Sequence, residues 1–176
     1  MTTRKITLTG LGIALYVALA LCLQVPVFEN YYLCFGYIAM AVYCCCFGPV
    51  SGAIVGSVGV VLYCLLTSGL RGMPGWALGN MVIGLALGVA CHLTEGMKNK
   101  SLRMALLMAI VLLSTAAGML GVKSLVEHLL YAQPMVVRMA KNMYAFVSDV
   151  IVLWVGLLIC PYLAPVLRKL FPELCR

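Results

Sequence analysis

The polar residues in the last long apolar segment have a spacing that points to chemistry. At about 100° per residue on a helix, Arg138, Asn142 and Asp149 fall within about 40° of one another, with Lys141 just to one side. A charged carboxylate at the centre of a membrane helix costs roughly 2.5–3.5 kcal/mol, and somewhat less near an end. We therefore expect Asp149 to face the bundle interior and find a partner. We interpret the stripe as part of a ligand site; a pair of Asp149 with a cation that only holds helices together is the alternative.

Two further residues with binding chemistry follow the glycine-rich segment 69–75. Trp76 and Asn80 are four residues apart and share a helical face with Ile83. An indole can stack on a flat ring, and a carboxamide both donates and accepts hydrogen bonds. The alternative for Trp76 is an anchor at the membrane interface.

The segment 123–131 is amphipathic. Lys123 and Glu127 are four residues apart and can pair, and His128 and Tyr131 share a surface. Such a segment is typical of an interfacial helix, which here would lie over the outer mouth as a lid. Aromatic, amide and charged residues together suit a pocket for a small, flat, polar molecule. The candidate substrate-binding residues are Tyr31, Arg71, Trp76, Asn80, Lys123, His128, Tyr131, Arg138, Asn142 and Asp149.

The composition requires these residues to be positioned by membrane helices. Of the 176 residues, 64% are hydrophobic and 10% charged, against about 45–50% and about 25% in a soluble domain. A crossing helix needs about 20 residues, and breakers at Pro26, Gly48-Pro49 and 69–75 divide the apolar runs. We predict an all-α, multi-pass protein of the plasma membrane, with residues 1–176 as one transmembrane domain. The six predicted helices span roughly 6–25, 33–47, 50–68, 75–93, 102–122 and 143–164, the second being short.

The distribution of Lys and Arg predicts that both termini are cytoplasmic. With that orientation the inner side holds Arg4, Lys5, Lys98, Lys100, Arg103, Arg168, Lys169 and Arg176, and the outer side holds Arg71, Lys123, Arg138 and Lys141. Because these cations flank apolar spans, we interpret the net charge of +7 as a topology signal and not as a nucleic-acid surface.

Several enzyme classes lack their motifs. The sequence contains no G-x-x-x-x-G-K-[ST], H-E-x-x-H or G-x-S-x-G pattern. The nine cysteines lie mostly in apolar spans with no C-x-x-C pair, so we interpret them as small apolar residues, with a metal or redox role as the alternative. We predict no metal site and no cofactor. A membrane enzyme that uses Asp149 with His128 or Arg138 is the less favoured alternative.

Small residues recur at four-residue spacing on three of the predicted helices, and such ridges let helix backbones approach closely. We expect the pairs Gly52/Gly56 and Gly84/Gly88 to pack within the chain. The ridge on the first helix could serve a partner subunit; it consists of Gly10, Ala14 and Ala18.

Several of these stretches resemble the substrate-binding (S) component of energy-coupling factor (ECF) vitamin transporters. The stretch from Phe35-Gly36-Tyr37 through 47–56 is similar to the helix 2 to helix 3 signature of that family. Pro74-Gly75-Trp76, followed by Gly84 and Gly88, is similar to the start of its helix 4, and Ala14 and Ala18 match its helix 1 ridge. One departure is Val60, near which several relatives carry an aspartate.

The resemblance implies a high-affinity binding subunit of an ABC importer, with no ATPase motif or enzyme activity of its own. It implies uptake of a vitamin or related micronutrient from outside, energised by a T-type transmembrane subunit and two ATPase subunits. The helix 1 ridge would dock onto the T subunit. Riboflavin, folate, pantothenate and queuosine precursors all remain candidate ligands. A structural or assembly subunit without a ligand is the alternative.

Overall fold

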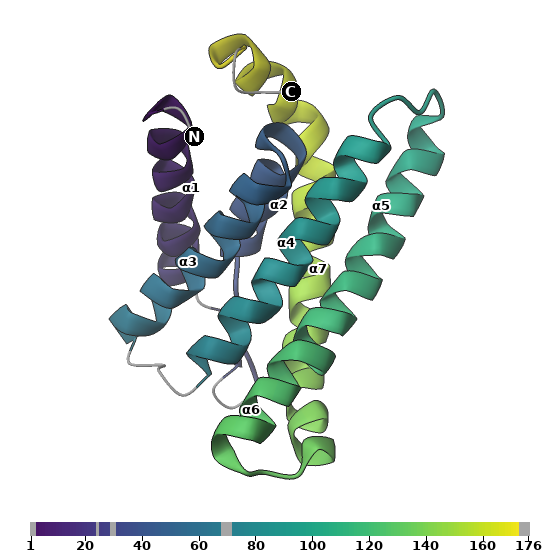
Figure 1. Cartoon of the computed structure of the whole chain (residues 1–176). Coiled ribbons are helices and arrows are strands. Elements are labelled where there is room, and N and C mark those ends of the chain that lie inside the picture. The colour runs from purple at the N-terminus through teal and green to yellow at the C-terminus, as the bar shows by residue number, and fades with distance from the viewer. Residues whose placement is uncertain (1–2, 24, 29–30, 68–71, 173–176) are drawn as a thin grey trace.

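The computed structural model describes residues 3–23, 25–28, 31–67 and 72–172, and it is a bundle of helices (Figure 1). Five spans in this part of the chain are long and apolar enough to cross a membrane, whereas α2 has only 12 residues. The predicted all-α membrane bundle is therefore confirmed. The helices are α1 (Thr3–Cys22), α2 (Gly36–Phe47), α3 (Pro49–Thr67), α4 (Met73–Leu93), α5 (Lys100–Thr115), the π-helical η1 (Ala116–Lys123), α6 (Ser124–Tyr131) and α7 (Met135–Leu170).

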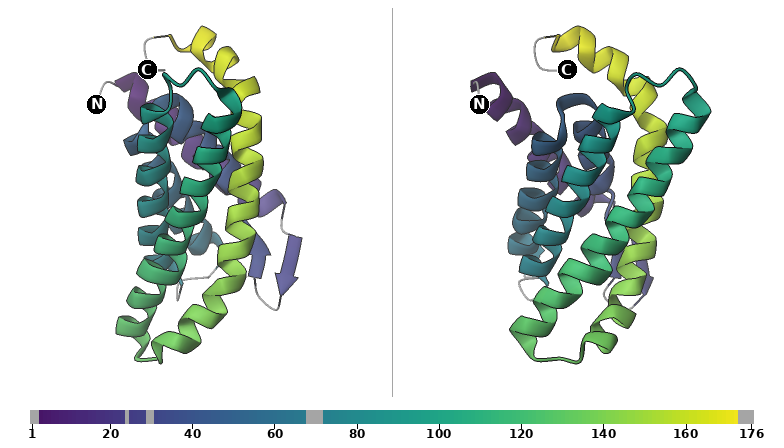
Figure 2. Two further views of the ribbon diagram at one scale, coloured as in Figure 1. Left: turned by 90° about the vertical axis from the view of Figure 1, so that its right-hand side faces the viewer. Right: turned by 45° about the vertical axis from the view of Figure 1, so that its right-hand side comes forward.

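The chain runs up and down, so both termini lie at one end of the bundle (Figures 1 and 2). We call this the terminal end, and we call the opposite end, where α6 turns into α7, the α6 end. The short helix α2 runs toward the terminal end, in the same direction as α4 and α7 (Figures 1 and 2). That the terminal end is cytoplasmic remains a prediction from the charge distribution.

The largest departures from the predicted helix ranges are in the last third of the chain. No separate interfacial helix follows residue 122, because α5, η1 and α6 form one continuous span of 32 residues (Figure 2). No proline interrupts this span, and Gly118 and Gly121 lie within the wide π-helical turns of η1 without ending the helix. The span ends at Ala132, whose φ of 50° is left-handed. Helix α7 then begins directly after Pro134 and continues past Pro161, so it is longer than predicted at both ends.

A small β-hairpin, which the sequence did not predict, connects α1 to α2. Its antiparallel strands are β1 (Val25–Phe28) and β2 (Tyr31–Leu33), with Val25 opposite Leu33 and Pro26 opposite Tyr32. Both strands of a two-stranded ribbon are edge strands, so the missing N–H of Pro26 is tolerated.

The glycine ridges of α3 and α4 pack inside the chain, as predicted. A Cβ added to Gly52 would collide with Cys44 of α2, and one on Gly84 or Gly88 would lie under 3 Å from the α3 backbone, at Ala53 and Pro49. These approaches bring α2, α3 and α4 together. The ridge on α1 differs: Gly10, Ala14 and Ala18 are all exposed.

Candidate functional site

The hydroxyl of Tyr37, in the first turn of α2, lies at the centre of a buried polar network. It accepts a hydrogen bond of 2.7 Å from Trp76 Nε1. Its proton is shared between Asn80 Oδ1 at 2.7 Å and Asp149 Oδ2 at 3.0 Å. Tyr37 and Asn80 have no exposed surface, and Asp149 is 2% exposed. One hydroxyl thus joins α2 to α4 and α7 and supplies the partner that Asp149 needs.

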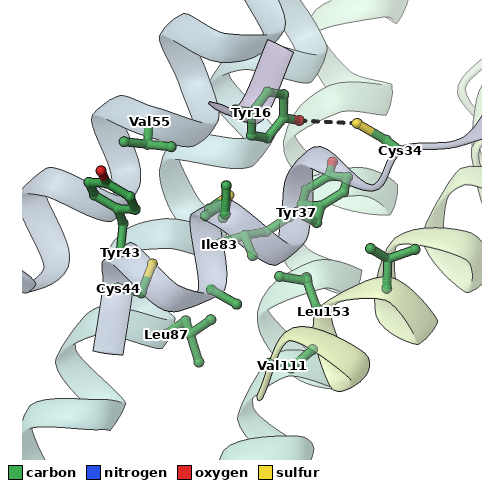
Figure 3. Close-up of a cluster of buried hydrophobic side chains, with 14 of the residues drawn as sticks. Tyr16, Cys34, Tyr37, Tyr43, Cys44, Val55, Ile83, Leu87, Val111 and Leu153 are labelled. Carbon is green, nitrogen blue, oxygen red and sulfur yellow. Dashed lines mark hydrogen bonds between the residues drawn. The ribbon is translucent and has the colours of Figure 1, made fainter. Parts of the chain in front are cut away.

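The amide of Asn80 carries the network to α1 and α3. Its Nδ2 donates to Tyr16 Oη at 3.2 Å and to the Gly56 carbonyl oxygen at 3.1 Å. The Tyr16 hydroxyl in turn lies 3.4 Å from Cys34 Sγ (Figure 3). Both ends of the carboxamide are therefore occupied, which fixes its orientation. We call this set the Tyr37 network: Tyr16, Cys34, Tyr37, Trp76, Asn80 and Asp149.

A second polar group joins α6 to α7. Asn142 Nδ2 donates to Ser124 Oγ at 3.0 Å and to Glu127 Oε2 at 3.1 Å. Arg138 Nη1 lies 3.7 Å from the same Glu127 oxygen, and its guanidinium is 5.6 Å from the Tyr131 ring centroid. Glu127 and Asn142 are buried. We call this set the Glu127 cluster: Ser124, Glu127, Tyr131, Arg138 and Asn142.

Lys123 lies between the two polar groups. Its Nζ is 5.7 Å from the ring centroid of Trp76, within cation–π range, and the residue is 7% exposed. It directly precedes Ser124, a member of the Glu127 cluster. Gly75 makes this position possible, because a Cβ there would lie only 3.0 Å from the Lys123 carbonyl oxygen. Lys123 therefore connects the Tyr37 network to the Glu127 cluster.

Most of the predicted site residues belong to these two groups. The inward stripe on α7 is confirmed for Asn142 and Asp149, whereas the neighbouring Lys141 is exposed. His128 does not join, since its Nδ1 pairs with the Gln133 carbonyl oxygen in the α6–α7 turn. His128 and Asp149 thus have different partners, the Gln133 carbonyl oxygen and the Tyr37 hydroxyl. Arg71 and the side chain of Tyr31 lie outside the described residues.

Five members of the two polar groups were not among the predicted binding residues: Tyr16, Cys34, Tyr37, Ser124 and Glu127. Tyr37 had a signal, because it follows Phe35-Gly36 at the start of the short second helix. Glu127 was noted only as a partner of Lys123. Tyr16 had none, since a tyrosine in an apolar helix is usually read as packing.

We expect Glu127→Gln to destabilise the fold more than the matched change Glu95→Gln. Buried Glu127 holds Arg138 and Asn142, so neutralising it leaves a half-buried guanidinium without its counter-charge and should cost about 1–3 kcal/mol. Glu95 pairs with Arg168 at the surface, where such pairs are worth about 0–1 kcal/mol. Unfolding in detergent measures both; equal losses would contradict a structural role for the Glu127 cluster.

Comparison with known families gives a match over nearly the whole chain. Residues 1–169 match the family model described as ECF-type riboflavin transporter, S component. The chain belongs to this S-component family. The match confirms the resemblance seen in the helix 2 to helix 4 stretches, and with the five membrane-spanning segments it makes this S component a multi-pass protein of the plasma membrane.

Individual relatives share part of the chain. A UPF0397 protein of Streptococcus thermophilus is 28% identical over 86 residues, 49% of this chain and 47% of the relative. A UPF0397 protein of Lactococcus lactis subsp. cremoris is 31% identical over 104 residues, 57% of this chain and 52% of the relative. The match thus spans about half the length of these relatives. The family model, by contrast, covers nearly all of this chain.

Proposed function

We propose that this S component binds a flat, vitamin-like molecule, with riboflavin as the first candidate, and passes it to an ECF importer. The observation that carries the proposal is the Tyr37 network, in which one buried hydroxyl is hydrogen-bonded to both Trp76 and Asp149. Buried polar groups in a membrane bundle are costly, and they concentrate where a ligand is handled. The name of the matched family supports riboflavin as the first ligand to test.

The surroundings of Trp76 suit a flat heteroaromatic ligand. The indole is half-buried, its N–H is held by Tyr37, and the edge of Tyr63 packs against it at 5.8 Å between ring centroids. This fixes the orientation of the indole ring. The Lys123 ammonium lies over the indole ring. A ligand ring could stack on the indole in its place, and the displaced ammonium could donate a hydrogen bond to the ligand. A ring system with carbonyl groups on its edge would use both residues.

The two tryptophans of the chain allow this proposal to be tested by fluorescence. Trp76 belongs to the Tyr37 network, whereas Trp154 of α7 donates to the Met108 carbonyl oxygen of α5 at 3.1 Å. In a Trp154→Phe variant the remaining emission comes from Trp76, and we expect riboflavin to quench it saturably. In a Trp76→Phe variant the emission comes from Trp154 and should change little, with riboflavin affinity reduced at least about tenfold.

Mass spectrometry of the purified protein identifies the ligand independently. We would purify the chain in mild detergent from cells grown in rich medium and analyse the small molecules that co-purify. A stoichiometric folate or pantothenate would replace riboflavin in the proposal and keep the binding role. An empty protein with no shift in Tm for any vitamin of a panel would instead support the structural-subunit alternative, in which the two polar groups only hold helices together.

We further propose that a T-type subunit docks on α1 and that two ATPases complete the importer. Gly10, Ala14 and Ala18 form an exposed ridge, and nothing lies within 4 Å of a Cβ placed on Gly10. A ridge of small residues accepts another helix at close range. The inward side of the same helix carries Tyr16 of the Tyr37 network.

We expect Ala14→Trp to reduce recovery of the T subunit and the ATPases at least about tenfold, because the indole would hold the partner helix away. Ligand binding by the isolated chain should stay unchanged. Ala105→Trp, at an exposed position of α5, is the matched control. Affinity isolation after gentle extraction measures both variants, and undiminished assembly of Ala14→Trp would remove α1 as the docking face.

A further inference from the structure

The structure pairs two cysteines from different helices at the terminal end. Cys45 lies in the last turn of α2 and Cys91 in the last turn of α4, and their sulfur atoms are in contact. Their Cα atoms are 5.2 Å apart, inside the range of about 4.4–6.8 Å that a disulfide spans. We expected the cysteines to act as small apolar helix residues, and the pairing of Cys45 with Cys91 corrects that expectation for these two.

Close packing of the helices explains the pairing. Gly84, Gly88 and Cys91 are spaced by four and three residues and thus share one face of α4. Cys44 Sγ donates to the Gly84 carbonyl oxygen at 3.4 Å, which holds α2 against that face. Cys45, the next residue of α2, therefore lies beside Cys91, which is nearly two turns along α4 from Gly84.

The neighbouring thiols are engaged elsewhere. Cys44 Sγ donates to the Gly84 carbonyl oxygen, and Cys46 packs with Val42 and Cys160 in a small buried group against which Cys45 also packs. Cys45 is partly exposed, whereas Cys44 and Cys46 are each 1% exposed. Of the three consecutive cysteines of α2, Cys45 is therefore the one that a small reagent can reach, and Cys91 is the thiol beside it.

We infer that Cys45 and Cys91 are a reversible redox site that ties α2 to α4. The chemistry is thiol–disulfide exchange with a low-molecular-weight disulfide such as oxidised glutathione. The Cys45 thiolate attacks one sulfur of the reagent, forming a mixed disulfide and releasing one thiol. The Cys91 thiolate then attacks the Cys45 sulfur, closes the intramolecular bond and releases the second thiol. Two protein thiols are oxidised, and one disulfide is reduced to two thiols.

The position of the pair gives this tether a structural consequence. The opposite ends of the same two helices carry Tyr37, on α2, and Trp76 and Asn80, on α4. Oxidation of the cysteine pair therefore links α2 and α4 covalently at the terminal end. The opposite ends of the same two helices hold the Tyr37 network. With the terminal end in the cytoplasm, as the charges predict, the pair is reduced in normal cells and closes when low-molecular-weight disulfides accumulate. The inference does not depend on which ligand is bound.

The experiment uses the full chain in detergent, treated with oxidised glutathione or with dithiothreitol and then alkylated. Chymotrypsin cleaves after Tyr43 and Phe47 and so isolates the three consecutive cysteines for mass spectrometry. We expect a link to the Cys91 peptide that dithiothreitol removes. It should persist in Cys44→Ala and Cys46→Ala and disappear in Cys45→Ala. Oxidation should raise Tm by at least about 5 °C in the wild-type chain, and not in Cys45→Ala.

Three results would overturn the inference. The first is that both thiols remain open to alkylation after the oxidant. The second is that the link maps to Cys46 or Cys160. The third is a correctly linked pair with an unchanged Tm, which would show that the bond does not tether the helices.

Discussion

Replacing Tyr37 by phenylalanine is expected to destabilise the S component by about 2–4 kcal/mol and to weaken riboflavin binding at least about tenfold. The lost hydroxyl is the acceptor for Trp76 Nε1 and the donor to Asn80 and Asp149. A buried polar group left without its hydrogen-bond partner destabilises the folded state by its full desolvation free energy. Here Trp76, Asn80 and Asp149 would all lose the same partner. Denaturant unfolding and ligand titration in detergent measure the two effects.

Tyr43→Phe is the matched control. Tyr43 lies on the same helix, is 6% exposed and donates one hydrogen bond of 3.0 Å to the Leu8 carbonyl oxygen. Its loss should cost about 0.5–1.5 kcal/mol and leave ligand binding unchanged. If Tyr37→Phe proved no more harmful than Tyr43→Phe, the Tyr37 hydroxyl would not be the centre of the site.

Replacing Gly88 by alanine is expected to lower the free energy of unfolding by about 1–3 kcal/mol or more. The new methyl group would lie 2.3 Å from Pro49 Cα and 2.8 Å from Pro49 N. These are backbone atoms at the start of α3, so the contact can be relieved only by moving one helix away from the other. Such a shift would also disturb the pairing of Cys45 with Cys91, three residues farther along α4.

Gly10→Ala is the control for this prediction. It adds the same methyl group to a helix, but nothing lies within 4 Å of that position. Alanine is favoured over glycine in a helix by about 1 kcal/mol, so the isolated chain should be unchanged or slightly more stable. Thermal unfolding of both variants in one detergent separates the two cases. Equal stability of Gly88→Ala and the wild type would mean that α3 and α4 are not in backbone contact.

The sequence alone determined the membrane bundle and much of the candidate site. Apolar runs of about 20 residues need no tertiary information to be recognised, because lipid selects them by length and polarity. The inward direction of Asn142 and Asp149 follows from helical spacing and from the cost of exposing a carboxylate to lipid. The family resemblance also rested on local stretches, such as Pro74-Gly75-Trp76.

What only the tertiary structure decided is which helices meet. Tyr37 lies in a family-like stretch, but only the packing of α4 and α7 places Asn80, Trp76 and Asp149 around its hydroxyl. His128 had suitable chemistry, but the turn at Ala132 directs its pairing to Gln133. Nothing in the sequence separates Cys45 from Cys44 and Cys46, but the structure places Cys45 beside Cys91 and leaves it partly exposed. Each of these depends on contacts between residues distant in the chain, which the periodicity of a single helix cannot encode.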